Sequence, residues 1–389
     1  MLGGGEHRGA RLFEPGGSQR WSRLFLAADD LTGALDTSAE FVGLFGTISV
    51  HWRLQRFPAS FALDTGAREA PGDVAATAVA ALLQSNPLDE TSLAFAKLDS
   101  LMRGNPAREI ATWLQFAPFD HCIVAPAFPA QARATRAGRQ YDLRRGVATL
   151  AGTDLAADLR RFGVDVALRR AGQAVPEGVS VWDAESDADL DAIVAGGLAR
   201  GGRVLWCGCG GLAGALARGA GRIPVQPAPL RGPVLALFGS DHPASAEQFA
   251  AFGCDALELT DGGAGACDAL SRRLRARGLA AVRLAFPTMV ARSEAAERIA
   301  REFGRLLNSV PVPATLFVCG GETLRAACGA VCAVRLDLIG RLAPGVPVSA
   351  MRGGRFDGVC VVSKSGAFGE PEQVKRLVAT AATPGEQGR

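Results

Sequence analysis

Residues 24–36 read LFLAADDLTGALD. An apolar run of strand length stops at two adjacent carboxylates, Asp29 and Asp30, and apolar residues then recur with the period of about 3.6 that is typical of a helix. Acids between a strand and a helix lie at the carboxyl edge of a parallel sheet, where open α/β proteins bind small molecules. One Asp could serve only as the helix N-cap. Because a cap needs a single carboxylate, the second one indicates a function.

The same strand–loop–helix unit recurs along the chain, which predicts right-handed crossovers and parallel sheets. In the first half, the expected strands at residues 24–28, 61–65 and 93–96 end beside Asp, Lys or Arg, and a fourth at residues 123–125 ends in the turn Pro126–Pro129. In the second half, those at residues 234–238, 315–319 and 359–362 end in Gly beside Ser, Thr or Lys, and the last is followed by an expected helix over Glu370–Ala381. Prolines at 224, 227, 229 and 233 mark a linker between the halves.

The composition of the 389-residue chain bounds its class. The length predicts about two domains, and 48% hydrophobic with 21% charged residues is ordinary for a soluble globular protein. A net charge of +3 without a basic block gives no indication of nucleic-acid binding. No run of about 18 apolar residues predicts a membrane span. Residues 1–21 lack the apolar core of a secretory signal and are expected to be a disordered leader.

The nine cysteines show no CxxC pair and no Cys/His ligand spacing. Cys207 and Cys209, which flank a glycine at the end of an expected strand, are predicted to be small buried thiols. Scattered cysteines in apolar segments fit the reducing cytoplasm.

Chemistry differs between the two sets of strand ends. Glycines at a strand-to-helix turn let the backbone approach an anion, and the helix N-terminus directs free N–H groups at it. Each such loop alone is weak evidence, and none matches the Walker A or GxGxxG spacing. Three of them on one sheet edge, with Lys364 among them, predict a polyphosphate site.

The first half instead suits a small polyhydroxylated anion. Arg68, Lys97 and Arg103 can hold a carboxylate. Asp29, Asp30 and Asp99 can accept hydrogen bonds from hydroxyls, and one of them can take the proton of an attacking hydroxyl. Lys97 and Asp99 could instead form a surface ion pair, although residues directly after a buried strand rarely face bulk solvent. A substrate pocket and a phosphate cradle on separate domains predict a kinase that closes and excludes water.

With these motifs the chain resembles the four-carbon acid sugar kinases, which use ATP to phosphorylate tetronates such as threonate, erythronate and 3-oxo-tetronate at the 4-hydroxyl. The resemblance runs from about Leu24 to Leu377 and rests on eight motifs in the family's order. These are ADDLTGA at 28–34 with Asp36, Asp64-Thr65 with Arg68, KLDS at 97–100 with RGN at 103–105, APAFP at 125–129, GGLA at 210–213, Gly239-Ser240, GGET at 320–323 and KSGAFG at 364–369.

The resemblance implies an α/β protein of two domains, each with a mainly parallel sheet flanked by helices, and an active site in the cleft between them. The expected segments are the leader over 1–21, a sugar-acid-binding domain over 22–223, the linker over 224–233, a nucleotide-binding domain over 234–382 and a tail over 383–389. ATP and Mg²⁺ are the implied cofactors. The partner is a small sugar acid, with no nucleic acid and no membrane, and a homodimer is left open.

The resemblance also implies roles for individual residues. From the paired acids themselves, where only one is needed as a cap, Asp30 is the expected catalytic carboxylate, with Asp29 its near rival and Asp99 the third candidate. Substrate contacts are implied at Asp29, Asp30, Arg68, Lys97, Leu98, Asp99, Ser100 and Arg103. Nucleotide contacts are implied at Ser240, Gly320, Gly321, Thr323, Lys364, Ser365, Gly366 and Ala367. No metal ligand is assigned.

This chain departs from the family's usual pattern at Gly66, Ala67, His242, Glu322 and Ala367. These departures keep open a second class, a non-catalytic ligand sensor descended from a kinase. A dehydrogenase or an aldolase-type α/β enzyme is a third hypothesis. The absence of GxGxxG and of a Lys in an apolar pocket argues against it.

Overall fold

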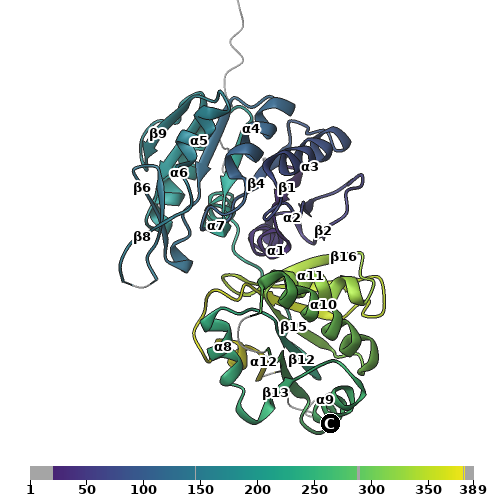
Figure 1. The fold of residues 1–389 in the computed structure, drawn as a ribbon. Helices are drawn as coiled ribbons and strands as arrows, with labels where there is room; N and C mark the ends of the chain where they lie inside the picture. The colour runs from purple at the N-terminus through teal and green to yellow at the C-terminus, as the bar shows by residue number, and fades with distance from the viewer. Residues whose placement is uncertain (1–20, 145, 287–289, 380, 382–389) are drawn as a thin grey trace, which may run out of the picture.

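The computed structural model describes residues 21–144, 146–286, 290–379 and 381. The expected tail and all of the expected leader except Trp21 lie outside these residues. Trp21 corrects that expectation, because its indole is buried against the core and does not belong to a disordered leader. Figure 1 shows two lobes, one coloured purple to teal and the other green to yellow, which meet near α1 and β16.

The first lobe is built on eight parallel strands in the order β2-β3-β1-β4-β11-β5-β10-β9. The strands are β1 (Arg23–Ala28), β2 (Ile48–His51), β3 (Phe61–Asp64), β4 (Ser92–Lys97), β5 (His121–Ala125), β9 (Val166–Arg170), β10 (Gly178–Asp183) and β11 (Val204–Gly208). The helices are α1 (Leu31–Ala39), α2 (Val42–Phe45), α3 (Gly72–Ser85), α4 (Pro106–Phe116), α5 (Leu155–Arg161), α6 (Asp187–Arg200) and α7 (Gly210–Gly219). A 3₁₀ turn, η1 (Pro129–Gln131), precedes a small antiparallel sheet of β6 (Arg133–Arg136), β7 (Arg139–Asp142) and β8 (Thr149–Ala151).

The central strands of this lobe, such as β1 and β4, are mostly apolar because both faces of the sheet are covered there. Along β1, Leu24 and Leu26 pack on one side together with α1, α6 and α7. Phe25 and Ala27 pack on the other side with α3, α4 and α5. This alternation with period two is what buries a continuous apolar run on two faces.

The second lobe places five parallel strands in the order β13-β14-β12-β15-β18, followed by antiparallel β17 and β16. The strands are β12 (Val234–Phe238), β13 (Ala256–Leu259), β14 (Leu279–Leu284), β15 (Thr315–Cys319), β16 (Arg335–Ala343), β17 (Val346–Arg352) and β18 (Cys360–Lys364). The helices are α8 (Pro243–Ala250), η2 (Gly253–Asp255), α9 (Ala264–Arg277), α10 (Arg292–Ser309), α11 (Gly321–Ala330) and α12 (Gln373–Ala379). The helix expected over Glu370–Ala381 therefore begins three residues later and is shorter.

The α/β class with mainly parallel, helix-flanked strands is confirmed, but the two sheets are joined. β16 pairs antiparallel with β2, so a single 15-stranded sheet runs through both lobes. In a flat sheet this pairing would point the parallel strands of the two lobes in opposite directions. A sheet twists by about 20–25° per strand, and over the steps from β15 to β1 the twist returns both sets toward a common direction.

Strand register sets the polar residues side by side. Ala28 is level with Asp64 on one neighbour and with Lys97 on the other, so the residues after β1, β3 and β4 share one edge. Cys319 is likewise level with Phe238 and Lys364, which aligns the loops after β12, β15 and β18. Sequence-distant motifs thus gather at two sheet edges.

All nine cysteines are free, and Cys207 and Cys209 are buried as expected. Within the described ranges, we find no helix long and apolar enough to cross a membrane.

Candidate active site between the lobes

A cavity of about 840 Å³ lies between the lobes and is lined from both of them. One end carries the acids and arginines that follow β1, β3 and β4, and the middle is formed by the glycine loops after β12, β15 and β18. Ligand sites commonly have this size and combine apolar walls with a few convergent polar groups. An active site in the cleft is therefore what the geometry favours.

Arg68 organises the acid end of the cavity. Its Nε donates to Asp29 Oδ2 at 2.9 Å, and its Nη2 donates to Asp29 Oδ1 and to Asp30 Oδ1 at 2.6 Å each. Asp99 Oδ1 lies 3.5 Å from the same Nη2. Burial raises the pKa of Asp29, even against the opposing charge of Arg68. One guanidinium thus holds the paired acids together, a use that the sequence did not indicate for it.

Asp99 is held as an ionised carboxylate. Burial alone would raise its pKa, but hydrogen bonds from the Arg103 side chain and the charges of Arg68 and Arg103 outweigh burial and place the pKa well below its usual range. Arg103 Nε and Nη2 each donate to Asp99 at 2.9 Å, and the backbone N–H groups of Leu101 and Arg103 also donate to it. So strongly held a carboxylate is a poor proton acceptor, which disfavours Asp99 as the base.

Asp30 is both the helix cap and a partly exposed acid. It is the N-cap of α1, and its Oδ1 accepts the backbone N–H of Gly33 at 2.9 Å. Among the described residues, no hydrogen bond to its Oδ2 is seen, and that oxygen faces the cavity near Gly321. The two readings of this residue are therefore compatible, since each oxygen serves one of them.

Lys97 lies beneath the start of α1. Its Nζ donates to the carbonyl of Leu98 at 2.7 Å and would lie 2.8 Å from a Cβ on Gly33. A glycine at position 33 therefore lets the helix sit directly on the buried ammonium. Ser100 lines the cavity, whereas the side chain of Leu98 is buried in the core.

Three further buried acids surround this end. Burial raises the pKa of Asp36 to about 6, of Asp64 to about 7 and of Glu109 to about 8. Asp36 and Asp64 line the cavity. Glu109, in the first turn of α4, was not singled out in the sequence, although an acid among apolar helix positions was the available signal.

The glycine loops pack closely on one another because their glycines carry no side chain. A Cβ on Gly239 would meet Thr323 Oγ1 at 2.0 Å, and one on Gly366 would meet Ser240 Oγ at 2.0 Å. Gly320 has a φ of +114°, which favours glycine. Ala367 is absent from the described residues with positive φ, so its Cβ causes no backbone strain.

Lys364 lies under its loop and not among the cavity-lining residues. It is fully buried, its Nζ donates to the carbonyl of Ser365 at 2.7 Å, and it sits 4.3 Å from the centroid of the Phe368 ring. Burial lowers its pKa. Because α12 begins only at Gln373, the expected helix N-terminus directly after the loop is wrong.

The far end of the cavity is apolar and was not predicted from the sequence. Phe238, Phe249, Leu284, Phe286 and Ile299 line it. Arg283 lies 4.6 Å from the Phe249 ring centroid and is ion-paired with Glu258, which marks a polar rim. The five apolar residues come from β12, α8, β14, α10 and the segment directly after β14, so no local motif indicates them.

Two family models match the chain, a sugar-binding N-terminal domain over residues 24–160 and a nucleotide-binding C-terminal domain over residues 234–374. The D-threonate kinase of Cupriavidus necator is 31% identical, with 88% of this chain and 94% of that protein aligned. The chain belongs to the four-carbon acid sugar kinase family. The D-threonate kinase of Bordetella bronchiseptica is 29% identical over 90% of this chain and 95% of that protein. A solved structure from Salmonella typhimurium LT2 shares the fold, with a TM-score of 0.71 at 17% identity over 91% of this chain and 98% of that one.

In this sugar acid kinase, the structure brings together most of the residues singled out in the sequence. All of those expected to contact substrate except Leu98, and all of those expected to contact nucleotide except Lys364, line the one cavity. The two exceptions act inside their loops, where Leu98 offers its carbonyl and Lys364 supports the turn.

The small sheet of the first lobe reaches the phosphate loop of the second. Arg144, which follows β7, donates to the carbonyl of Ala367 and is itself held by Asp142, with Nη2 2.8 Å from Oδ2. Asp142 also pairs with the buried Arg133 at 2.6 Å. The kinase therefore has a polar contact that runs from the first lobe to the second.

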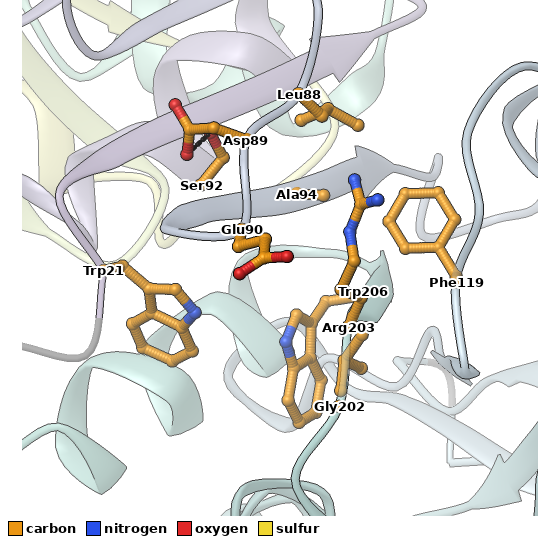
Figure 2. A pocket seen from close by; sticks show the side chains of 11 residues that line it. Trp21, Leu88, Asp89, Glu90, Ser92, Ala94, Phe119, Gly202, Arg203 and Trp206 are labelled. Atoms are coloured by element: carbon orange, nitrogen blue, oxygen red, sulfur yellow. Dashed lines mark hydrogen bonds between the residues drawn. The ribbon is translucent and has the colours of Figure 1, made fainter.

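A second cavity, of about 50 Å³, lies among Trp21, Trp206 and Arg203 at the opposite edge of the first lobe's sheet (Figure 2). It has room for a few water molecules but not for a sugar acid or a nucleotide. The large cavity between the lobes is thus the one that fits the kinase's substrates.

Proposed function

We propose that this protein is an ATP-dependent kinase that phosphorylates the terminal hydroxyl of a four-carbon sugar acid, with D-threonate as its first candidate substrate. One observation carries the proposal. A single cavity joins an Asp/Arg cluster suited to a polyhydroxylated anion with three glycine loops suited to phosphates. Its relatives named as D-threonate kinases align along nearly their whole length.

Each end of the cavity has a distinct task. The apolar end around Phe249 and Phe286 suits a purine ring, and the loops carrying Ser240, Gly321 and Gly366 suit the phosphates. Arg68 and Arg103 each donate hydrogen bonds to aspartates through Nε and Nη2. Their Nη1 groups are suited to binding the substrate carboxylate. In this proposal, Asp30 Oδ2 accepts the proton of the attacking hydroxyl.

Mg²⁺ fits the nucleotide side of the site. Within the described residues there is no cluster of three or more acidic, His or Cys ligands. Mg²⁺ in kinases needs only one or two carboxylates, because phosphate oxygens and water complete its shell. Asp241 and Glu322 line the cavity beside the glycine loops and would hold it. When bound, it would neutralise charge on the phosphates.

The test is release of ADP in a coupled assay over D- and L-threonate and D- and L-erythronate, with glycerate as a three-carbon control. We expect turnover to be highest with D-threonate. Asp30→Asn should lower kcat by about 10²–10⁴-fold while the protein stays folded. The ligand sensor would be favoured by two results together. Wild type would show no more turnover than Asp30→Asn on any of the acids, and calorimetry would still show that it binds ATP and a tetronate.

Two further expectations belong to this proposal. We place the kinase in the cytoplasm because its nine cysteines are free. A homodimer stays a prediction, and light scattering on the purified chain tests it.

A further inference from the structure

Arg133 of β6 is a buried arginine with unused hydrogen-bond donors. Its side chain is only 3% exposed, yet the residue lines the large cavity. Nη1 donates to the carbonyls of Gln131 and Ala132 and, at 2.6 Å, to Asp142 Oδ1. Neither Nε nor Nη2 donates a hydrogen bond to a described residue, and of these two only Nε is shut off from solvent. Nη2 is therefore the donor that Arg133 offers to a ligand in the cavity.

The charge of Arg133 is only partly compensated. Asp142 is shared with Arg144, whose Nη2 lies 2.8 Å from Asp142 Oδ2, so two guanidinium groups face one carboxylate. Burial and the charge of Arg144 lower the pKa of Arg133, against the charge of Asp142. At Arg68, by contrast, burial is outweighed by the charges of three aspartates, and the pKa is raised. A further anion beside Arg133 would therefore stabilise its charged form.

Arg133 is connected to the phosphate loop of the second lobe. It shares Asp142 with Arg144, and Arg144 donates to the carbonyl of Ala367 in that loop. The loop provides no lysine to the cavity, because Lys364 lies beneath it. Among the described residues of the second lobe, two arginines line the cavity, and each is paired with an acid. Arg133 thus offers the cationic side chain that the phosphate loops lack.

Arg133 is also close to the acid end of the cavity. The charge of Asp99 acts on it, and Gln140 of β7 fixes the small sheet to the neighbouring loop by donating to the carbonyl of Ser100 at 3.0 Å. A group that binds to Arg133 therefore lies between the acid cluster and the phosphate loops. The transferred phosphoryl group fits this place, because it begins on the nucleotide and ends on the sugar acid. The substrate carboxylate fits less well, since the proposed function already gives it two other arginines.

We propose that Arg133 is a catalytic residue that donates from Nη2 to an oxygen of the transferred phosphoryl group. The inference rests on the proposed kinase function. In the reaction, the substrate hydroxyl oxygen bonds to the γ phosphorus, and the bond from that phosphorus to the β–γ bridging oxygen breaks. The hydroxyl proton passes to Asp30 and then to water, and ADP leaves. Arg133 stays protonated throughout, so it stabilises negative charge on the phosphoryl oxygens and transfers no proton.

The test compares Arg133→Gln with wild type by calorimetry, using Mg²⁺ with ADP or with an ATP analogue in which nitrogen replaces the β–γ bridging oxygen. The analogue carries the γ-phosphate, and ADP does not. We expect Arg133→Gln to weaken binding of the analogue by about 10- to 100-fold, the effect of one lost hydrogen bond to a charged group. The affinities for ADP and for D-threonate should remain near wild type, and kcat should fall by about 10²-fold or more.

Arg133→Lys is the second variant, since it keeps a positive charge beside Asp142 but lacks the second donor. It should also lose affinity for the analogue, although less than Arg133→Gln does. Arg144 still pairs with Asp142 in both variants, and melting checks that each one folds. Arg136→Gln is the matched control, because Arg136 lies on the same strand and pairs with Glu185 at 2.7 Å, outside the cavity. It should bind both nucleotides as wild type does.

Equal affinity of wild type and Arg133→Gln for the analogue would overturn the proposal. An equal loss for ADP would do so by showing a general effect on nucleotide binding, and a loss for D-threonate alone would place the sugar acid's carboxylate at Arg133. If Arg133→Gln does not fold, the same comparisons with Arg133→Lys decide. Because the analogue needs no acceptor, an inactive wild type whose binding of the analogue depends on Arg133 counts against the proposed function and not against this inference. A wild type that binds neither nucleotide would overturn both.

Discussion

Several residues of this kinase have a role that could not be predicted from the residue type alone. The paired acids at 29 and 30 were recognisable from the sequence because a cap needs only one. That Arg68 would hydrogen-bond to both of these acids could not be recognised from the sequence, since a guanidinium at a strand end suits the carboxylate of a ligand equally well. Which partner an arginine takes is decided by burial and distance, and both depend on the fold.

Glu109 is an instance in which burial decides the charge. Burial raises its pKa to about 8, the charge of Asp29 adds to the rise, and Arg68 and Lys97 oppose it. Its Oε1 lacks a hydrogen-bond partner among the described residues. Glu109 is therefore mostly neutral at neutral pH, which limits the negative charge under the acid cluster.

The consequence is a pH-dependent effect of Glu109→Gln. The folded pKa is raised above the usual 4.5, so the stability that neutral Glu109 contributes is complete below that value and is lost as pH rises through about 8. The Gln variant cannot lose it. The stability of Glu109→Gln relative to wild type should thus rise with pH, by at most about 1.4 kcal/mol per unit. Thermal melting at about pH 6 and about pH 9 measures it. The exposed Glu247→Gln should show no such trend, and a pH-independent difference for Glu109→Gln would contradict the assignment.

At the scale of elements, the strand–loop–helix units were largely readable, because apolar period and polar strand ends are local features. The antiparallel strands β16 and β17 were not predicted, nor was the late start of α12. Those depend on long-range partners, since β16 forms only by pairing with β17 and with β2. The apolar end of the cavity was not predicted for the same reason, since its residues come together only in the folded chain.

The loop after β18 gives a matched pair of substitutions. Gly366 packs against Ser240, where a Cβ would approach Oγ to 2.0 Å, so Gly366→Ala should displace one loop from the other and weaken ATP binding by about tenfold or more. Ala367 has no positive φ, so Ala367→Gly should leave ATP affinity unchanged or slightly lower. Calorimetry with ATP separates the two. Tighter binding by Ala367→Gly would show that the Cβ strains this loop after all.

For the whole molecule, the joined sheet is supplemented by ion pairs between the lobes. Arg341 of β16 pairs with the buried Glu40 at 2.6 Å, and Arg325 of α11 pairs with Asp64 of β3 at 2.6 Å. Gly66, a departure from the family's usual pattern, makes room for the second pair, because a Cβ there would lie 3.0 Å from Arg325 Nη1. This departure from the family's usual pattern is thus a place where the two lobes meet.

The Asp64–Arg325 pair makes the joint between the lobes sensitive to pH. Burial raises the pKa of Asp64 to about 7 against the opposing charge of Arg325. In Arg325→Gln that opposition is gone, so the pKa of Asp64 should rise further. Near pH 6 the carboxyl is mostly neutral with or without Arg325, and the variant should lose little stability. Near pH 8 wild type holds an ionised, paired Asp64, whereas the variant must bury an unpaired charge or keep its proton. Its melting temperature should therefore fall further below wild type at about pH 8 than at about pH 6, by a few degrees.

Arg277→Gln removes a surface pair with Asp255 inside one lobe and should give the same small loss at both pH values. If Arg325→Gln behaves like this control, Asp64 does not depend on the second lobe for its charge.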